Sequence, residues 1–176
     1  GKTELAIRAA FRVVVNGGKV LVMAPTSILS RQLFEVFSLR SGSFGVSVGL
    51  FTGACSNIDR NSVKDAWVQG ACDVVIGTNS ITYDSVFIKF SNMIIIDEEH
   101  RFGVKDKEGF LEGYETKDVL LMSATPIPRS LNLSLSGLND ISTLGAPPVL
   151  RRPIQTFISY FNDVVIKRSV EYELNR

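Results

Sequence analysis

Five short apolar runs, separated by stretches with helical periodicity, limit what this chain can fold into. Each run has strand length and is rich in β-branched residues, and the five runs cover residues 19–24, 46–51, 73–77, 93–97 and 118–123. Helical periodicity, with apolar side chains at every third or fourth position, is found in residues 4–15, 27–39, 59–69 and 129–135. This alternation is typical of an α/β domain with a doubly wound, mainly parallel sheet.

The chain has room for one core followed by a tail. Its 176 residues, 45% of them hydrophobic, fit a single domain of ordinary size, which we place at residues 1–145. Residues 145–154 read GAPPVLRRPI, and this proline-rich, basic stretch is typical of a linker. Within residues 146–176 we also expect a strand at 154–160 and a helix at 163–176, which would start a second domain.

Charge and cysteine content exclude several classes of protein. Nineteen Lys and Arg residues against 18 Asp and Glu leave a net charge of +1, so nucleic-acid binding must rest on local geometry. Cys55 and Cys72 lie far apart and there is one histidine, which favours neither a zinc site nor a disulfide framework. No apolar run approaches the roughly 18 residues that span a bilayer. We therefore expect a cytoplasmic protein without a membrane partner.

The tripeptide Gly1-Lys2-Thr3 stands directly before a helical stretch, where the end of a GxxxxGK[ST] phosphate-binding loop belongs. Backbone N–H groups at a helix start favour an anion, Lys2 adds a point charge for the outer phosphates, and the Thr3 hydroxyl can ligate Mg²⁺. A solvated chain end would also explain so short a match. On the first interpretation the chain begins inside this loop, and the sheet is truncated at its N-terminal edge.

A second candidate site follows the apolar run 93–97. This run ends in Asp97-Glu98-Glu99-His100, which places acidic side chains at the carboxyl end of a buried strand. Parallel α/β sheets bind ligands at this edge. Asp97 would hold Mg²⁺, while Glu98 would orient and deprotonate the water that attacks the γ-phosphate. An acidic turn that caps the next helix is the alternative, but together with Gly1-Lys2-Thr3 the pattern favours ATP hydrolysis.

The segments GKTE, APTSILSRQ, IGTN, DEEHRFGVKDKE and SATPIPRSL occur in the order in which superfamily 2 helicases and translocases carry their motifs. The chain resembles this superfamily over nearly its whole length. Two bacterial groups are most similar, the transcription-repair coupling factors and the RecG branch-migration helicases. Residues 132–157, together with Glu99 and the segment ELAIRAAF, are more similar to the coupling factors.

The resemblance implies a first RecA-like P-loop NTPase domain that binds ATP and Mg²⁺. Gly1, Lys2 and Thr3 would bind the nucleotide, with Thr3 and Asp97 at the metal. His100 would join Asp97 and Glu98 in the catalytic motif. A further motif would link the ATP state to the grip on nucleic acid through Ser123, Ala124, Thr125 and Arg129.

The resemblance also implies contacts to the backbone of DNA without base readout. The matching residues are Pro25, Thr26, Gln32, Thr52, Gly53, Gly77, Thr78 and Asn79. Thr26 has a plain alternative as the N-cap of a helix, which is compatible with phosphate binding because a helix start is itself a phosphate site. A different DNA grip is a basic cluster near the linker, made of Arg151, Arg152, Lys167 and Arg168, although exposed charges are more often a solvated face.

Three functions remain open at this point. The first is a coupling-factor motor that walks on double-stranded DNA and displaces stalled RNA polymerase. It would need a second RecA-like domain of the same chain and would contact the polymerase through other domains. The second is a RecG-type motor on branched DNA. The third is a non-catalytic nucleic-acid or partner-binding module, which intact Lys2, Thr3, Asp97 and Glu98 argue against. In each motor the fragment alone should be inactive.

Overall fold

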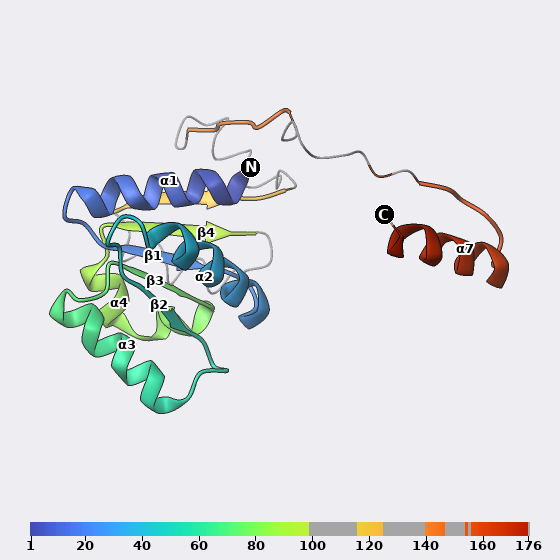
Figure 1. Cartoon of the computed structure of the whole chain (residues 1–176). Helices are drawn as coiled ribbons and strands as arrows, with labels where there is room; N and C mark the ends of the chain where they lie inside the picture. The colour runs from blue at the N-terminus through green and yellow to red at the C-terminus, as the bar shows by residue number, and fades with distance from the viewer. Residues whose placement is uncertain (99–115, 125–139, 147–153, 155, 176) are drawn as a thin grey trace. The chain divides into compact units, whose positions relative to one another are not determined.

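A computed structural model describes residues 1–98, 116–124, 140–146, 154 and 156–175. The chain divides into two compact units, Gly1–Thr143 and Leu144–Arg176. The first unit holds the sheet and the helices that cover it (Figure 1). The second holds the helix α7, Asp163–Leu174.

The five expected runs form one parallel sheet, as predicted. The strands are β1 Val20–Met23, β2 Val48–Phe51, β3 Val74–Gly77, β4 Met93–Asp97 and β5 Asp118–Met122. Their order across the sheet is β2-β3-β1-β4-β5, and every neighbouring pair is parallel. Because all strands run in the same direction, their carboxyl ends lie at one edge, and the chain segments that follow the strands meet there.

Helices cover both faces of the sheet, which confirms the doubly wound arrangement (Figure 1). One face packs against α1 Lys2–Val15 and α2 Ser27–Ser41. The other packs against α3 Asn57–Gln69, the short 3-10 helix η1 Asn79–Tyr83 and α4 Ser85–Phe90. The alternation of side chains along each strand explains the two cores. In β1, Val20 and Val22 pack on the α1/α2 side, whereas Leu21 and Met23 pack on the α3/α4 side.

The sequence did not predict η1 and α4. Both are short, but Ile81 and Phe87 are fully buried in the core on the α3/α4 side. The Phe87 ring lies 4.7 Å from that of Phe51, at an edge-to-face angle. A segment with one anchoring side chain per element has too few repeats to reveal a period.

The tail differs from expectation in one respect. Residues 154 and 156–160 have no strand, so the expected strand there is wrong. A strand needs a neighbour to pair with, and Ile158 is 97% exposed. The expected helix does form, as α7, with Asn162 as its N-cap. The helix expected at 129–135 lies outside the described residues. Within the described part, no helix has the length and apolar character needed to cross a membrane.

Candidate nucleotide and nucleic-acid sites

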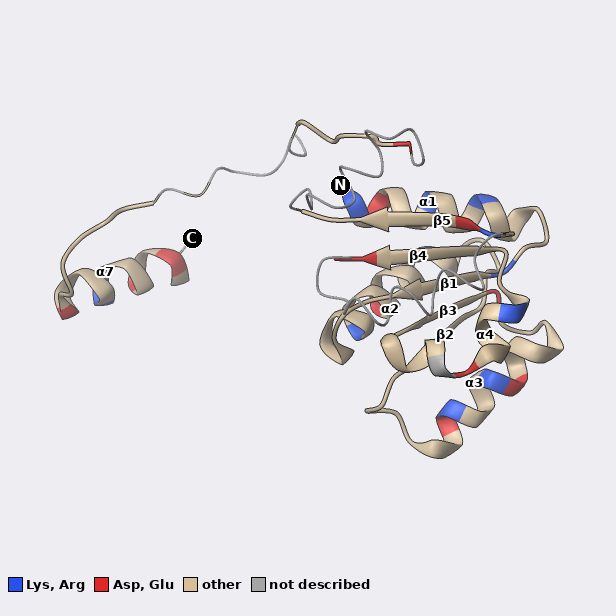
Figure 2. Cartoon of the chain, turned by 180° about the vertical axis from the view of Figure 1, so that it is seen from behind, with Lys and Arg blue, Asp and Glu red and all other residues tan. Residues whose placement is uncertain are grey.

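The two acidic residues and the start of α1 lie together at the carboxyl edge of the sheet. Lys2 Nζ donates to Glu98 Oε1 at 2.6 Å and is 3.9 Å from Asp97 Oδ1, although Lys2 and Glu98 are 96 residues apart in sequence. In Figure 2, the acidic tip of β4 and the basic start of α1 are on the same side of the sheet. The side chains of Lys2 and Glu98 are 30% and 22% exposed, so solvent reaches the pair only in part.

The start of α1 differs from the other helix starts. Elsewhere in the described chain, each α-helix has a side chain that accepts a hydrogen bond from its first turn, and these caps are Thr26, Ser56, Asp84 and Asn162. At α1 the N-cap is Gly1, which offers no such acceptor. The first-turn N–H groups of α1 therefore remain available to an anion, and Lys2 adds a positive charge beside them.

Asp97 and Glu98 have unusual environments. Burial is the main cause that raises the pKa of Asp97 and the Glu98 carboxylate raises it further, while Lys2 and the Glu98 N–H lower it. Glu98 N–H donates to Asp97 Oδ1 at 3.1 Å. The backbone of Glu98 has φ +53°, a left-handed conformation that costs a non-glycine residue about 1–3 kcal/mol. A strained backbone of this kind persists only where the surrounding structure holds it, here at the end of a buried strand.

The segment after β5 lies next to these acids. In the β4–β5 register, Asp97 pairs with Met122, so Ser123 and Ala124 follow the strand position beside Asp97. Thr3 is in the first turn of α1, directly after Lys2. Three residues expected in this site, His100, Thr125 and Arg129, lie outside the described residues.

The residues expected to contact nucleic acid follow three adjacent strands. Pro25 and Thr26 come after β1, Thr52 and Gly53 after β2, and Thr78 with Asn79 after β3. Since β2, β3 and β1 are neighbours in the sheet, these residues lie along the carboxyl edge, away from the outer strand β5.

Thr26 also has the plain role that was the alternative. It is the N-cap of α2, because the Leu29 N–H donates to Thr26 Oγ1 at 3.3 Å. Its hydroxyl hydrogen is still available, so the cap does not exclude a phosphate contact. Gln32 lies one turn further along α2 and lines a pocket together with Ser27, Arg31 and Thr52.

The two glycines of this set have different reasons to be glycine. At Gly77 a Cβ atom would lie 2.1 Å from the Phe51 carbonyl oxygen and 2.3 Å from Ile81 Cδ1, so packing alone requires glycine. At Gly53 a Cβ atom would meet nothing within 4 Å. The fold thus leaves open space at Gly53, as close approach of a ligand needs, but fully explains Gly77 without one.

Hydroxyl contacts distinguish the two threonines that follow β2 and β3. Thr52 is buried, and its Oγ1 lies 3.4 Å from Cys55 Sγ. Thr78 Oγ1 lies 3.0 Å from Ser80 Oγ in the first turn of η1. Cys72 comes two residues before β3, at the amino edge of the sheet and away from these threonines. Burial raises the pKa of its thiol to about 11. Cys72 is therefore a packing residue of the core on the α3/α4 side.

Sequence reasoning missed two features on α3. One is Arg60, whose guanidinium stacks on the Phe51 ring at the same sheet edge. An arginine in a polar helical stretch looks like a solvated surface residue, so no local pattern indicated the contact with Phe51.

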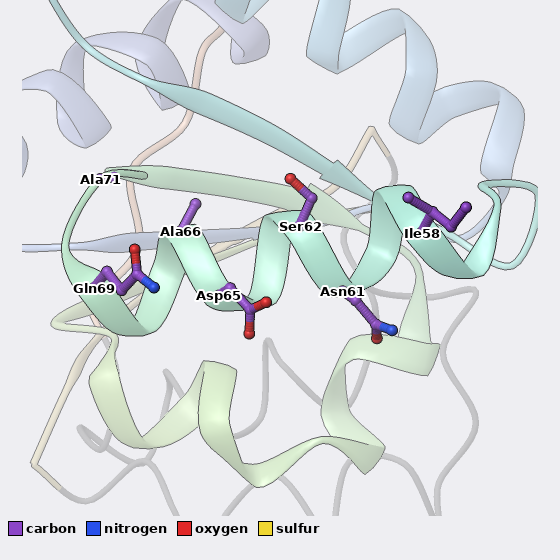
Figure 3. Close-up of a pocket in the computed structure, with 7 residues that line it drawn as sticks. All are labelled: Ile58, Asn61, Ser62, Asp65, Ala66, Gln69 and Ala71. Atoms are coloured by element: carbon purple, nitrogen blue, oxygen red, sulfur yellow. The ribbon is translucent and has the colours of Figure 1, made fainter.

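The other feature is a shallow pocket along α3, lined by Ile58, Asn61, Ser62, Asp65, Ala66, Gln69 and Ala71 (Figure 3). No residue of the candidate sites lines this pocket. In the described residues, no group of three or more His, Cys, Asp or Glu side chains could hold a metal.

Known proteins resemble this chain in both sequence and fold. Curated relatives over all 176 residues include the transcription-repair-coupling factors of Borreliella burgdorferi, 41% identical, and Bacillus subtilis, 38% identical. The chain spans 16% and 15% of the length of these two relatives. A structure of RecG bound to a three-way DNA junction matches 98% of the present chain, with a TM-score of 0.71 and 33% identity. The match covers 23% of the RecG chain.

A more distant structure supports the fold alone. A DEAD box protein from the hyperthermophile Methanococcus jannaschii matches 70% of the present chain, with a TM-score of 0.55 and 20% identity. The match covers 36% of the DEAD box protein. The resemblance to superfamily 2 motors is confirmed by the match of residues 1–133 to the model of the DEAD/DEAH box helicases. Since this match takes in both α1 and the acidic end of β4, the chain belongs to the DEAD/DEAH box helicase family.

Proposed function

We propose that this chain is the ATP-binding motor domain of a DNA translocase of the coupling-factor type. The observation that carries the proposal is the meeting of Lys2 with Asp97 and Glu98 at the carboxyl edge of the sheet, with a 2.6 Å contact between Lys2 and Glu98. A lysine at an uncapped helix start beside two acids provides, in one place, binding for phosphate, a ligand for a metal and a base for water.

The residues present fit ATP with Mg²⁺. The N–H groups of the first turn of α1 and the Lys2 ammonium would hold the phosphates, while the Thr3 hydroxyl and the Asp97 carboxylate are the hard oxygen donors that Mg²⁺ prefers. Bound Mg²⁺ neutralises charge on the transferred phosphoryl group. Glu98 would accept the proton of the attacking water. Because Glu98 directly follows Asp97 in the sequence, the base lies next to the metal ligand. His100 belongs to this proposal by resemblance.

DNA would lie along the carboxyl ends of β2, β3 and β1. Thr26, Gln32, Gly53, Thr78 and Asn79 offer hydroxyl, amide and backbone donors there, which bind phosphates without reading bases. A motor that walks over any sequence needs contacts of this kind. Thr52 is buried against Cys55, so it would support this edge from beneath. The pocket between α2 and Thr52, lined by Gln32, supports this placement. Gly77 is assigned to packing and not to DNA.

The second unit belongs to the same proposal as a linker and the start of the second RecA-like domain, over residues 146–176. Its described apolar side chains are open to solvent, with Ile158 and Tyr160 each 97% exposed. Exposed apolar surface of this kind is typical of a contact with other protein, which supports the assignment. Ser123, Ala124, Thr125 and Arg129 would transmit the ATP state between the two motor domains. RNA polymerase as a partner, reached through other domains, and a cytoplasmic location follow from the coupling-factor type.

A RecG-type motor on branched DNA is the second candidate, and the 33% identity with RecG over 98% of the chain favours it. The test uses the full-length protein that contains this chain. A coupling factor should hydrolyse ATP in the presence of duplex DNA and displace a stalled RNA polymerase, whereas a RecG-type motor should convert a branched junction instead. Lys2→Ala should remove either activity. If the wild-type protein hydrolyses no ATP with either DNA, the motor proposal fails.

A further inference from the structure

Arg60, at the carboxyl edge of the sheet, makes no ion pair with any of the described residues. It is in the first turn of α3, at the end of the helix where Figure 3 labels Ile58 and Asn61. Its guanidinium carbon lies 4.7 Å from the centroid of the Phe51 ring. Its Nε atom is buried, and no hydrogen bond from it is made within the described part of the chain.

Two charged residues close to Arg60 on α3 already have partners. Lys64, one turn beyond Arg60, pairs with Asp84 at 2.7 Å. The adjacent Asp59 carboxylate accepts a hydrogen bond from the Ser56 hydroxyl at 2.7 Å, and the Asp59 N–H donates to that hydroxyl oxygen at the N-cap of the helix. Among the described residues, Arg60 makes no ion pair with either acid. Its planar group is therefore held by the ring of Phe51, while its charge is left for a partner from outside the domain.

The place of Arg60 identifies the kind of partner. Phe51 is the last residue of β2, directly before Thr52 and Gly53. In the sheet, Phe51 pairs with Gly77, the residue directly before Thr78. The guanidinium is thus anchored at the point where two of the proposed DNA-contacting loops leave the sheet. The hydroxyl and amide donors of those loops are neutral, so Arg60 would add a positive charge for an anion bound there.

We propose that Arg60 binds a phosphodiester group of the DNA and adds a positive charge to this track from the α3 side, as Arg31 does beside Gln32 from α2. Phe51 orients the guanidinium plane, and its outer N–H groups donate to two oxygens of one phosphate. This inference deepens the proposed function and rests on it. A phosphodiester is favoured over an acidic protein segment because the adjacent hydroxyl and amide donors continue in a line along three strands.

The test measures the binding of a labelled duplex of arbitrary sequence to the full-length protein, by fluorescence anisotropy across a salt series. Three variants are compared, Arg60→Gln, Arg60→Lys and the control Arg12→Gln. Arg12 is an exposed arginine in the last turn of α1, at the opposite edge of the sheet, so its loss changes the net charge equally. Melting temperatures of all variants are recorded to separate binding from folding.

Arg60→Gln should lower the affinity by roughly tenfold at low salt, as loss of a hydrogen bond to a charged group does. It should also reduce the slope of log K against log salt by about 0.9, the value for one neutralised phosphate. Arg60→Lys should keep the slope and lose only part of the affinity, and Arg12→Gln should change neither. A melting temperature lowered in both Arg60 variants, with slopes equal to wild type, would assign Arg60 to structure and overturn the proposal. Absence of DNA binding by the wild type would instead refute the proposed function.

Discussion

Replacing Glu98 with glutamine tests how Lys2 and the two acids divide the work of hydrolysis. The change keeps the size of the side chain and a carbonyl oxygen near Lys2, but removes the charge and the ability to accept a proton from water. Positioned general bases contribute about 10²–10⁴-fold to rate, which is about 2.7–5.5 kcal/mol of barrier. We therefore expect kcat for ATP hydrolysis, measured with saturating duplex DNA in the full-length protein, to fall by that factor.

The same substitution should have the opposite effect on nucleotide binding. Lys2 Nζ lies 2.6 Å from Glu98 Oε1, and the two side chains are 30% and 22% exposed. Lys2 must leave this partner to reach a phosphate, and a partly exposed ion pair is worth about 1 kcal/mol or less. Glu98→Gln should then tighten ATP binding by up to about fivefold. Lys2→Ala should weaken binding by about tenfold or more, since it removes a charged hydrogen-bond donor.

Glu4→Gln is the matched control for this experiment. Glu4 is in the first turn of the same helix but pairs with Arg8 at 2.9 Å and Arg40 at 2.7 Å, so its replacement should leave both kcat and nucleotide affinity unchanged. Binding is followed with a fluorescent ATP analogue and turnover by phosphate release. If Glu98→Gln hydrolysed ATP within threefold, roughly, of wild type, Glu98 would not be the base.

Other substitutions test the site and the cores separately. Because burial raises the pKa of Asp97, the ionised carboxylate destabilises the fold, and Asp97→Asn should raise the melting temperature near neutral pH. The difference in melting temperature between the variant and the wild type should shrink as pH falls through the Asp97 pKa, because the wild type then takes up a proton. A difference that stays constant with pH would refute the raised pKa of Asp97. Gly77→Ala should cost at least about 2 kcal/mol in a urea titration, since its Cβ would overlap the Phe51 oxygen, whereas Gly53→Ala should stay within about 0.5 kcal/mol. Phe87→Ala should cost about 3–5 kcal/mol, and a smaller loss would show that the core on the α3/α4 side collapses around the cavity.

The three central strands could be predicted because both of their faces are buried. In β1, β3 and most of β4 each residue packs into one core or the other, so the sequence there is an unbroken apolar run. The structure shortens four of the expected runs by one or two residues at one or both ends and leaves 93–97 unchanged. The run at 154–160 has the same local character, yet it forms no strand. Local preference is not enough without a neighbouring strand to supply backbone hydrogen bonds.

The candidate site was predictable in its residue types but not in its contacts. Lysine before a helix and acids after a strand are patterns with a known chemistry, and the sheet brings both to one edge. The direct contact of Lys2 with Glu98 and the left-handed backbone of Glu98 depend on the packing of α1 against β4, which no local pattern records. Arg60 was missed for the same reason, because its partner Phe51 comes from another element.

The sheet register places Thr78 of the proposed DNA track two strand spacings from the proposed ATP site, while Pro25 and Thr26, after β1, are one spacing away. Met23, the last residue of β1, pairs with Gly77 on one side and with Ile96 on the other. Gly77 directly precedes Thr78, and Ile96 directly precedes Asp97. Neighbouring strands are about 4.8 Å apart, so the two sites are separated by roughly 10 Å of backbone that is hydrogen-bonded throughout. A change in the end of β4 on hydrolysis therefore has a short, stiff route to the DNA contacts through β1, which gives a physical reason for both sites to share this edge.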